Sequence, residues 1–373
     1  MLRFITAGES HGPGLVALLE GIPAGLPLSA DDLLPMLARR QQGYGRGQRQ
    51  QIEQDHAEII AGVVGGRTIG SPLALLVPNR DYANWRDRKT PPWRRPRPGH
   101  ADLAGAIKYG LYDLRLVAER ASARETAARV AAGAVAVRLL AQVGVQVGSY
   151  VRAIGPVRAD VETLPVPQRV ERARASNVAC PDEAAAERMR AAIDAAQAAG
   201  DSLGGLFDVV AWGLPVGLGS YVQWDRRLDA RLAAAVMSIQ AVKGVEIGPA
   251  FANARLPGTA VHDALYPGDA GLQRRTNRAG GLEGGMTNGE PLILTAAIKP
   301  IPTTLTPQLT VDLDTGQPVQ TEYQRSDGCA VPAAAVVGEA MVALTLAEAI
   351  IERYGGDSLA ALQQRMGGAH VHP

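Results

Sequence analysis

Lysine is scarce in this chain. Of the 38 cationic side chains among 373 residues, only four are lysines (Lys89, Lys108, Lys243 and Lys299), and the other 34 are arginines. Codon bias is the simplest explanation of most of this asymmetry. Arginine, however, also recognises phosphate and carboxylate groups bidentately, whereas lysine acts as a point charge. The positions of the arginines therefore matter more than their number.

Cysteine, long apolar runs and excess charge are lacking as well. The two cysteines, Cys180 and Cys329, cannot form a disulfide framework or a Cys-rich zinc site, and no metal site is expected. No run of 18 or more apolar residues is present, and the N-terminus has no apolar signal segment, so we expect a cytoplasmic protein that does not enter the membrane. The net charge of +1 argues against a generally basic nucleic-acid coat.

Glycine, in contrast, is abundant, with 42 of 373 residues compared with a usual share of about 7%. Between the glycines, apolar patterns of strand and helix type alternate, with no linker and no low-complexity segment. Strands are predicted over residues 14–21, 57–64, 72–77, 145–154, 206–214 and 291–298. Helices are predicted over residues 30–40, 122–144, 182–199, 227–240 and 332–354. We predict one α+β domain over residues 1–373, with strands packed around Ala-rich helices.

Two short segments of the chain resemble each other weakly, and we call this similarity the internal echo. Residues 21–26 (Gly-Ile-Pro-Ala-Gly-Leu) resemble residues 213–218 (Gly-Leu-Pro-Val-Gly-Leu), and each segment joins a predicted strand to a predicted helix. Two related halves that share one core would explain the echo, although six residues can also match by chance.

Two of the polar segments lie in the first fifty residues. Residues 8–12 (Gly-Glu-Ser-His-Gly) place His11, whose charge changes near neutral pH, between glycines that let a ligand approach; an ordinary turn with a solvated histidine is equally open. Residues 39–49 contain four arginines and no acid. A helix C-terminus explains the first two, because cations are favoured there, but it does not explain Arg46 or Arg49.

Two further segments combine arginine with a turn or a helix start. Residues 86–97 carry six cations and one acid, and the neighbouring prolines aim Arg97 and His100. Arginine with tryptophan can also bind single-stranded nucleic acid, which the neutral chain as a whole disfavours. In residues 120–126, Ser122 and Glu125 fit a capping box, and the free N–H groups of such a helix start bind anions.

The last four segments lie in the C-terminal half. Residues 240–248 predict a helix that ends at Gly244, and five glycines within residues 280–289 predict turns whose bare backbone borders a planar or anionic ligand. Residues 299–303 follow a predicted strand, and residues 325–332 precede a predicted helix. There Asp327 can act as a helix cap and Cys329 as a small buried hydrophobe.

In this order, and over more than three hundred residues, the eight segments resemble the chorismate synthase family. The resemblance implies a β-α-β sandwich, with long central helices between antiparallel sheets, assembled as a homotetramer. It implies the 1,4-elimination of phosphate from 5-enolpyruvylshikimate 3-phosphate to give chorismate, the last common step of the shikimate pathway to aromatic amino acids. The reaction requires reduced FMN, although it involves no net redox change. A substrate with one phosphate and two carboxylates explains why a neutral chain gathers arginines in a few glycine-bordered loops.

The resemblance also implies the residues of the site. As a protonated acid, His11 would help the phosphate to leave, a contribution of roughly 10²–10⁴-fold; Ser10 would orient it. His100 would control the charge of the flavin, and Asp327, relayed through Ser122, would take the proton. The expected substrate-binding residues are Arg40, Arg46, Arg97, Ser122, Arg124 and Arg325. The expected flavin-binding residues are Arg120, Ala121, Ser122, Gln240, Ala241, Gly284, Lys299, Pro300, Ile301, Pro302, Thr303 and Arg325.

The source of the reduced flavin and two alternative functions are left open by the sequence. Arg40 and Arg46 would also hold NADPH as the reductant of the flavin, unless a separate flavin reductase supplies reduced FMN. The first alternative function is a flavin reductase without lyase activity. The second is a nucleic-acid-binding module, which would show strongly salt-dependent binding to single strands.

Overall fold

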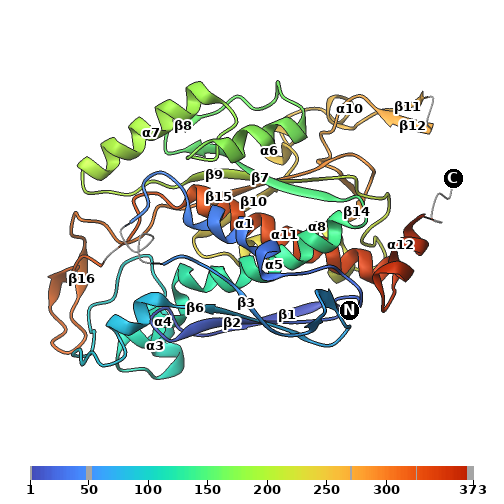
Figure 1. Ribbon diagram of the computed structural model, residues 1–373. Coiled ribbons are helices and arrows are strands. Elements are labelled where there is room, and N and C mark those ends of the chain that lie inside the picture. Colours follow the sequence, from blue (N-terminus) through green and yellow to red (C-terminus); the bar gives the residue numbers. More distant parts are fainter. Residues whose placement is uncertain (1, 48–52, 269–270, 325, 368–373) are drawn as a thin grey trace.

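The computed structural model describes residues 2–47, 53–268, 271–324 and 326–367 (Figure 1). Its N-terminal part contains a four-stranded sheet in which every neighbouring pair is antiparallel. In spatial order the strands are β1 (Arg3–Ala7), β2 (Gly14–Glu20), β6 (Leu73–Pro78) and β3 (Glu58–Ala61). A five-stranded sheet, also antiparallel throughout, consists of β10 (Val242–Ile247), β15 (Leu292–Ile298), β9 (Gly205–Trp212), β7 (Gln146–Ile154) and β8 (Val157–Arg158).

Long helices lie between the two sheets (Figure 1). They are α1 (Ala30–Gln41), α5 (Thr126–Ala141), α8 (Leu228–Met237) and α11 (Val331–Tyr354). Helix α5 contacts β2 and β6 of the four-stranded sheet, and α11 contacts β7 and β9 of the five-stranded sheet. Where α5 crosses α11, a Cβ atom on Gly133 would lie only 2.3 Å from the Cβ of Ala340. The small residues predicted for these helices therefore allow a very close approach of the two backbones.

Helix α11 is long and apolar enough to cross a membrane. In this structure 89% of its apolar window is buried inside the protein, as is typical of the core helix of a globular fold. It begins at Val331, with Pro332 in its first turn as the sequence predicts.

Shorter elements surround this core. Helices α6 (Val166–Ala175) and α7 (Glu183–Ala198) contact β7 of the five-stranded sheet, and α3 (Asp102–Tyr109) packs against α4 (Leu114–Ala121). The 3-10 helices are η1 (Arg80–Asn84), η2 (Ala123–Glu125) and η3 (Trp224–Arg226), and the other short α-helices are α9 (Ala250–Asn253), α10 (Gly258–Val261) and α12 (Leu359–Gly367). The small hairpins pair β4 (Val63–Val64) with β5 (Arg67–Thr68), β11 (Leu265–Gly268) with β12 (Gly271–Arg274), β13 (Leu282–Glu283) with β14 (Met286–Thr287), and β16 (Leu309–Val311) with β17 (Pro318–Gln320).

The α+β class is confirmed, and the predicted strands and helices are present with changed ends. The strand predicted over residues 57–64 is broken at Gly62, where φ is 93°. Ser122 is an N-cap as predicted, but of the short turn η2, and α5 begins only at Thr126. The reciprocal half of the capping box is wrong, because the Ser122 N–H bonds to the backbone oxygen of Ala118 instead of Glu125. The helix stop predicted at Gly244 is also wrong, since that residue lies in β10. No predicted helix covers α3, α4, α6, α9, α10 or α12.

The internal echo has a conformational counterpart. Residues 21–26 join β2 to α1, and residues 213–218 lead from β9 towards α8. Gly21 and Gly25 have φ values of 92° and 90°, and Gly213 and Gly217 have φ values of 76° and 85°. Both segments therefore use the left-handed region at equivalent positions, where glycine is favoured.

Candidate active site

Loops from distant parts of the chain converge on one cavity of about 1050 Å³. Its walls come from the loops that follow β1, α1, α4, α8 and β15, and from the first turns of α11. Ligand pockets have volumes of roughly 300–1,000 Å³. This cavity is therefore large enough for a substrate and a cofactor together.

Most of the predicted site residues line this cavity, namely Ser10, His11, Arg40, Arg46, Arg97, His100, Ala121, Ser122, Arg124, Gln240, Ala241, Lys299, Ile301, Pro302, Thr303 and Asp327. Three predicted residues are not among the lining residues. Arg120 instead donates to the backbone oxygens of Thr6 and Gly8. Pro300 stands between lining neighbours, and Gly284 lies in the turn between β13 and β14, with open space around its Cβ position. The prediction for Arg325 lies outside the described residues.

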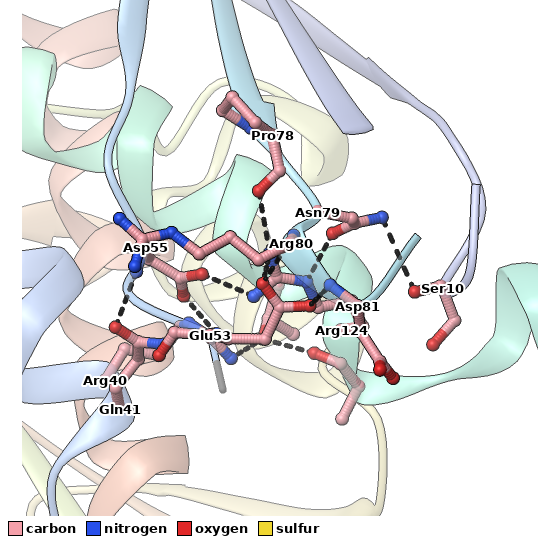
Figure 2. A network of polar contacts seen from close by, with 12 residues as sticks. Ser10, Arg40, Gln41, Glu53, Asp55, Pro78, Asn79, Arg80, Asp81 and Arg124 are labelled. Atoms are coloured by element: carbon pink, nitrogen blue, oxygen red, sulfur yellow. Dashed lines mark hydrogen bonds and ion pairs between the residues drawn. The ribbon is translucent and has the colours of Figure 1, made fainter. Parts of the chain in front are cut away.

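Two of the predicted substrate arginines share a buried counterion (Figure 2). Arg40 donates to one oxygen of the Asp55 carboxylate, and Arg124 donates to the other. Both guanidinium side chains are 5% exposed, and the carboxylate is fully buried. Burial alone would raise the pKa of Asp55, but the two arginines outweigh it and hold that pKa below its usual value. No sequence motif marked this aspartate.

Further polar side chains surround Arg124 (Figure 2). Arg124 Nε donates to Asn79 Oδ1 at 2.8 Å, and Glu53 lies 3.6 Å from the same guanidinium. Glu53 also accepts the backbone N–H of Arg80 at 3.0 Å. These contacts fix the orientation of the Arg124 guanidinium in the wall of the cavity.

A third predicted arginine is paired with the predicted proton acceptor. Arg46 NH1 lies 2.6 Å from Oδ2 of Asp327, and the backbone N–H of Gly47 donates to Oδ1 at 2.7 Å. Burial lowers the pKa of Arg46 despite the attraction of Asp327. The structure therefore brings together two residues that the sequence could only place in separate segments.

His100 belongs to a second compact unit. Its Nδ1 lies 2.5 Å from Oδ1 of Asp102, and Arg97 forms bonds to the same carboxylate at 2.8 and 2.9 Å. Burial would raise the pKa of Asp102, but hydrogen bonds from Arg97 and His100 hold it well below its usual value. Asp102 therefore orients both neighbours as a charged acceptor. We did not single it out from the sequence, although it stands in the same short motif.

His11 is held in a similar way by a residue that we also missed. Glu119 Oε1 lies 2.7 Å from Nδ1 of His11, and the ring of Trp85 packs over the imidazole with 4.1 Å between centroids. Ser10 Oγ, expected to orient the histidine, bonds to Ser122 Oγ at 3.3 Å. None of these three contacts had a signal in the sequence, because the partners of His11 and Ser10 come from other segments of the chain.

The positive charge predicted for residues 86–97 is largely compensated. Arg94 pairs with Asp314 at 2.8 Å, and Arg95 pairs with Asp312 at 3.3 Å and with Glu322. These acids lie on or beside the β16–β17 hairpin. The arginine-rich loop is therefore an attachment point for this hairpin, which weakens the nucleic-acid reading.

Gln240, in the cavity wall, has a buried side-chain oxygen that accepts no hydrogen bond from the described residues. Gln240 Nε2 donates to Glu125 at 3.1 Å, and this bond orients the amide. Among the described residues Gln240 Oε1 is buried without a partner, and so are Arg40 Nε and Arg46 Nε. Leaving such groups unpaired costs roughly 1–3 kcal/mol each. The two arginine N–H groups are donors that fit an anionic ligand. The amide oxygen of Gln240 is an acceptor that fits a ring with an N–H donor, as the flavin ring has.

Both cysteines are buried free thiols. Cys329 is fully buried, and burial raises the pKa of its thiol to about 11. Cys180 is 2% exposed, with its pKa raised by burial to about 11 as well. Both therefore remain protonated thiols at neutral pH.

Comparisons with known proteins agree with one another. Residues 2–351 match the family model described as chorismate synthase. The chain is 52% identical over 385 residues to chorismate synthase of Geobacter sulfurreducens, with 99% of this chain and 98% of the relative covered. It is 55% identical over 377 residues to that of Moorella thermoacetica, with 98% and 97% covered. A crystal structure of chorismate synthase superposes with a TM-score of 0.81 at 44% identity, covering 98% of this chain and 96% of that one.

Proposed function

The chain belongs to the chorismate synthase family, and from this premise we propose that the large cavity is where the family's reaction takes place. Chorismate synthase is a carbon–oxygen lyase that converts 5-enolpyruvylshikimate 3-phosphate to chorismate and phosphate, and it requires reduced FMN. In this 1,4-elimination the carbon–oxygen bond to phosphate breaks and a ring proton leaves to a base. The site must therefore bind a polyanion, protonate phosphate and accept a proton.

The single observation that carries the assignment is the set of buried arginines. Arg40, Arg46 and Arg124 line the cavity with side chains at most 9% exposed, and the Nε atoms of the first two have no acceptor among the described residues. A phosphate or carboxylate accepts such donors bidentately. A substrate with three acidic groups is thus complementary to this wall. Arg97 and Ser122 extend the proposed substrate surface.

Two side chains receive proton-transfer roles in this proposal. His11 lines the cavity with one ring nitrogen bound to Glu119, and its other nitrogen delivers a proton to the departing phosphate. Asp327 accepts the ring proton after an anion has drawn Arg46 away from it. The hydroxyl of Ser122 lies in the same wall and is available for relay.

Another part of the same lining is the proposed flavin site. The chemistry that reduced FMN would supply there is transient electron donation to the substrate, with no net redox change. The backbone from Lys299 to Thr303 and the amide of Gln240 would hold it, with His100 beside it. Lys299 Nζ is already fixed by the backbone oxygen of Gly99. Ala241 has φ of 67°, so a strained turn shapes this wall.

Four further properties belong to the same proposal. Arg40 and Arg46 would bind NADPH unless a separate reductase supplies the flavin. The helices between antiparallel sheets correspond to the family's sandwich, built from two related halves within one domain. The enzyme would act in the cytoplasm as a homotetramer.

An anaerobic assay with photoreduced FMN and 5-enolpyruvylshikimate 3-phosphate tests the site. We expect chorismate and phosphate in equal amounts from the wild type. Arg124→Ala should raise KM at least tenfold. The control Arg172→Ala, which changes an exposed arginine of α6, should have no effect. If NADPH is oxidised and no chorismate appears, the flavin-reductase alternative is correct. Equal KM values for the two variants would contradict the proposed substrate wall.

A further inference from the structure

Glu119 holds His11 at two points. Its Oε1 lies 2.7 Å from the ring Nδ1, and its Oε2 accepts the backbone N–H of His11 at 2.7 Å. We propose that Glu119 is a positioning residue that keeps a proton on Nδ1 of His11 and aims Nε2 at the leaving phosphate. This inference rests on the role of His11 as proton donor in the proposed function.

The local structure explains why the two side chains meet. Glu119 lies in the last turn of α4, and its backbone oxygen accepts the N–H of Ser10 at 2.9 Å. Gly8 starts the loop with φ of 109°, where a Cβ would lie 2.4 Å from the backbone oxygen of Gly14. The loop of residues 8–12 is thus bent by a glycine and tied to the end of α4.

Trp85 restrains the other side of the imidazole. Its ring lies 4.1 Å from the His11 ring, centroid to centroid, with 36° between their planes. The indole is fixed in turn, since Nε1 donates to Asp81 at 3.2 Å and the Arg88 guanidinium stacks on its ring at 4.9 Å. With Glu119 at Nδ1 and Trp85 at its face, the imidazole has little freedom to rotate.

Hydrogen-bond chemistry decides which nitrogen donates. A carboxylate only accepts hydrogen bonds, so Nδ1 of His11 must carry the proton shared with Glu119. The proton transferred to phosphate then leaves from Nε2, while the carboxylate keeps its hydrogen bond to Nδ1. A buried aspartate has the same effect on the histidine of a serine-protease triad.

A purely structural role for Glu119 would explain only half of these contacts. The backbone N–H of His11 and the Ser10 contact already tie the loop to α4. The bond to Nδ1 adds nothing to that attachment beyond orienting the ring. The distinguishing measurement is therefore one that detects the ring rather than the fold.

The test compares Glu119→Gln and Glu119→Asp in the anaerobic chorismate assay. Glu119→Gln should lower kcat about 10- to 100-fold, with KM for the substrate changed less than about threefold, because removing the charge affects proton transfer. Glu119→Asp keeps the charge and should recover part of kcat. Glu187→Gln, an exposed glutamate of α7, is the matched control and should match the wild type.

Two further measurements separate positioning from stability. In a His11→Ala background, Glu119→Gln should have no additional effect on kcat, because both act through one proton transfer. ¹⁵N NMR of labelled histidines, with His11 assigned by its substitution, should show the Nδ1-protonated form at high pH in the wild type and its loss in Glu119→Gln. Thermal unfolding of each variant shows whether a loss of kcat comes from unfolded protein. If it does, the ¹⁵N signal of His11 in the folded fraction decides whether Glu119 positions the ring.

Specific results would overturn the inference. An unchanged kcat and unchanged His11 signal in folded Glu119→Gln would exclude the positioning role, as would an additive loss in the His11→Ala background. A wild-type enzyme that forms no chorismate would instead refute the proposed function. Full activity of His11→Ala would refute the role of the histidine itself while leaving the lyase assignment intact.

Discussion

Asp327 and Arg46 form an ion pair, with 2.6 Å between Oδ2 and NH1, although they lie near opposite ends of the chain. One is the proposed proton acceptor and the other a proposed substrate ligand, so in the absence of substrate each neutralises the other. An incoming phosphate or carboxylate competes with Asp327 for the guanidinium. Binding of the substrate would thereby free the base that the reaction needs.

This pairing predicts opposite kinetic effects for its two members. Asp327→Asn should lower kcat by roughly 10²–10⁴-fold, the usual contribution of a general base, and should leave KM unchanged or lower it, because Arg46 loses a competitor. Arg46→Ala should mainly raise KM. Steady-state rates of chorismate formation measure both. A raised KM in Asp327→Asn would contradict the competition.

His100 offers a direct test of the flavin wall. His100→Ala should lower turnover with photoreduced FMN by at least tenfold while leaving the fold intact, since the imidazole is a terminal member of the Arg97–Asp102 unit. The comparison is with His262→Ala, which alters an exposed histidine that does not line the cavity. Wild-type turnover of His100→Ala would show that the assignment is wrong.

Asp55 should be important for stability because it is the shared partner of Arg40 and Arg124. Removing one member of a buried ion pair costs about 3–5 kcal/mol, so Asp55→Ala should lose that much free energy of unfolding. Urea denaturation monitored by circular dichroism measures the loss. Asp225→Ala, at an exposed aspartate, should change the midpoint little; similar midpoints for the two variants would refute this role.

The depressed pKa of Asp102 predicts a dependence of stability on acid. The ordinary pKa of an aspartate is about 3.9. The contribution of the charged carboxylate is therefore fully present above about pH 4 and is lost as the pH falls through the lower, folded-state pKa. Asp102→Asn lacks this contribution, so its urea midpoint should fall less steeply between pH 5 and pH 2. Parallel curves for the wild type and the variant would exclude this linkage.

The crossing of α5 and α11 can be tested by one methyl group. Gly133→Ala would place a Cβ 2.3 Å from that of Ala340, and overpacking of a core typically costs about 1–3 kcal/mol. Gly367→Ala, in α12, meets no atom within 4 Å and is the control. Thermal unfolding should show a lower Tm for Gly133→Ala alone. Equal Tm values for Gly133→Ala and Gly367→Ala would mean that α5 and α11 can move apart without a loss of stability.

Local patterns predicted much of the fold. The short apolar run over residues 291–298 and the capping residue Ser29 before α1 predicted the ends of their elements to within a residue or two, because such runs and caps depend only on near neighbours in the chain. Helix α6, by contrast, has three arginines and two prolines nearby in a polar stretch. Its helical form depends on packing against β7, which no local pattern reveals.

The sequence by itself determined which side chains could do the chemistry, since its motifs contain His11, His100, Asp327 and the arginines. Only the tertiary structure decided the partner of each one. Asp55 and Glu119 stand in no motif, and their role comes from helices and loops that meet around one cavity. The physical reason is that a charge acts through space over a few ångströms, whereas a sequence pattern reports only the order of residues along the chain.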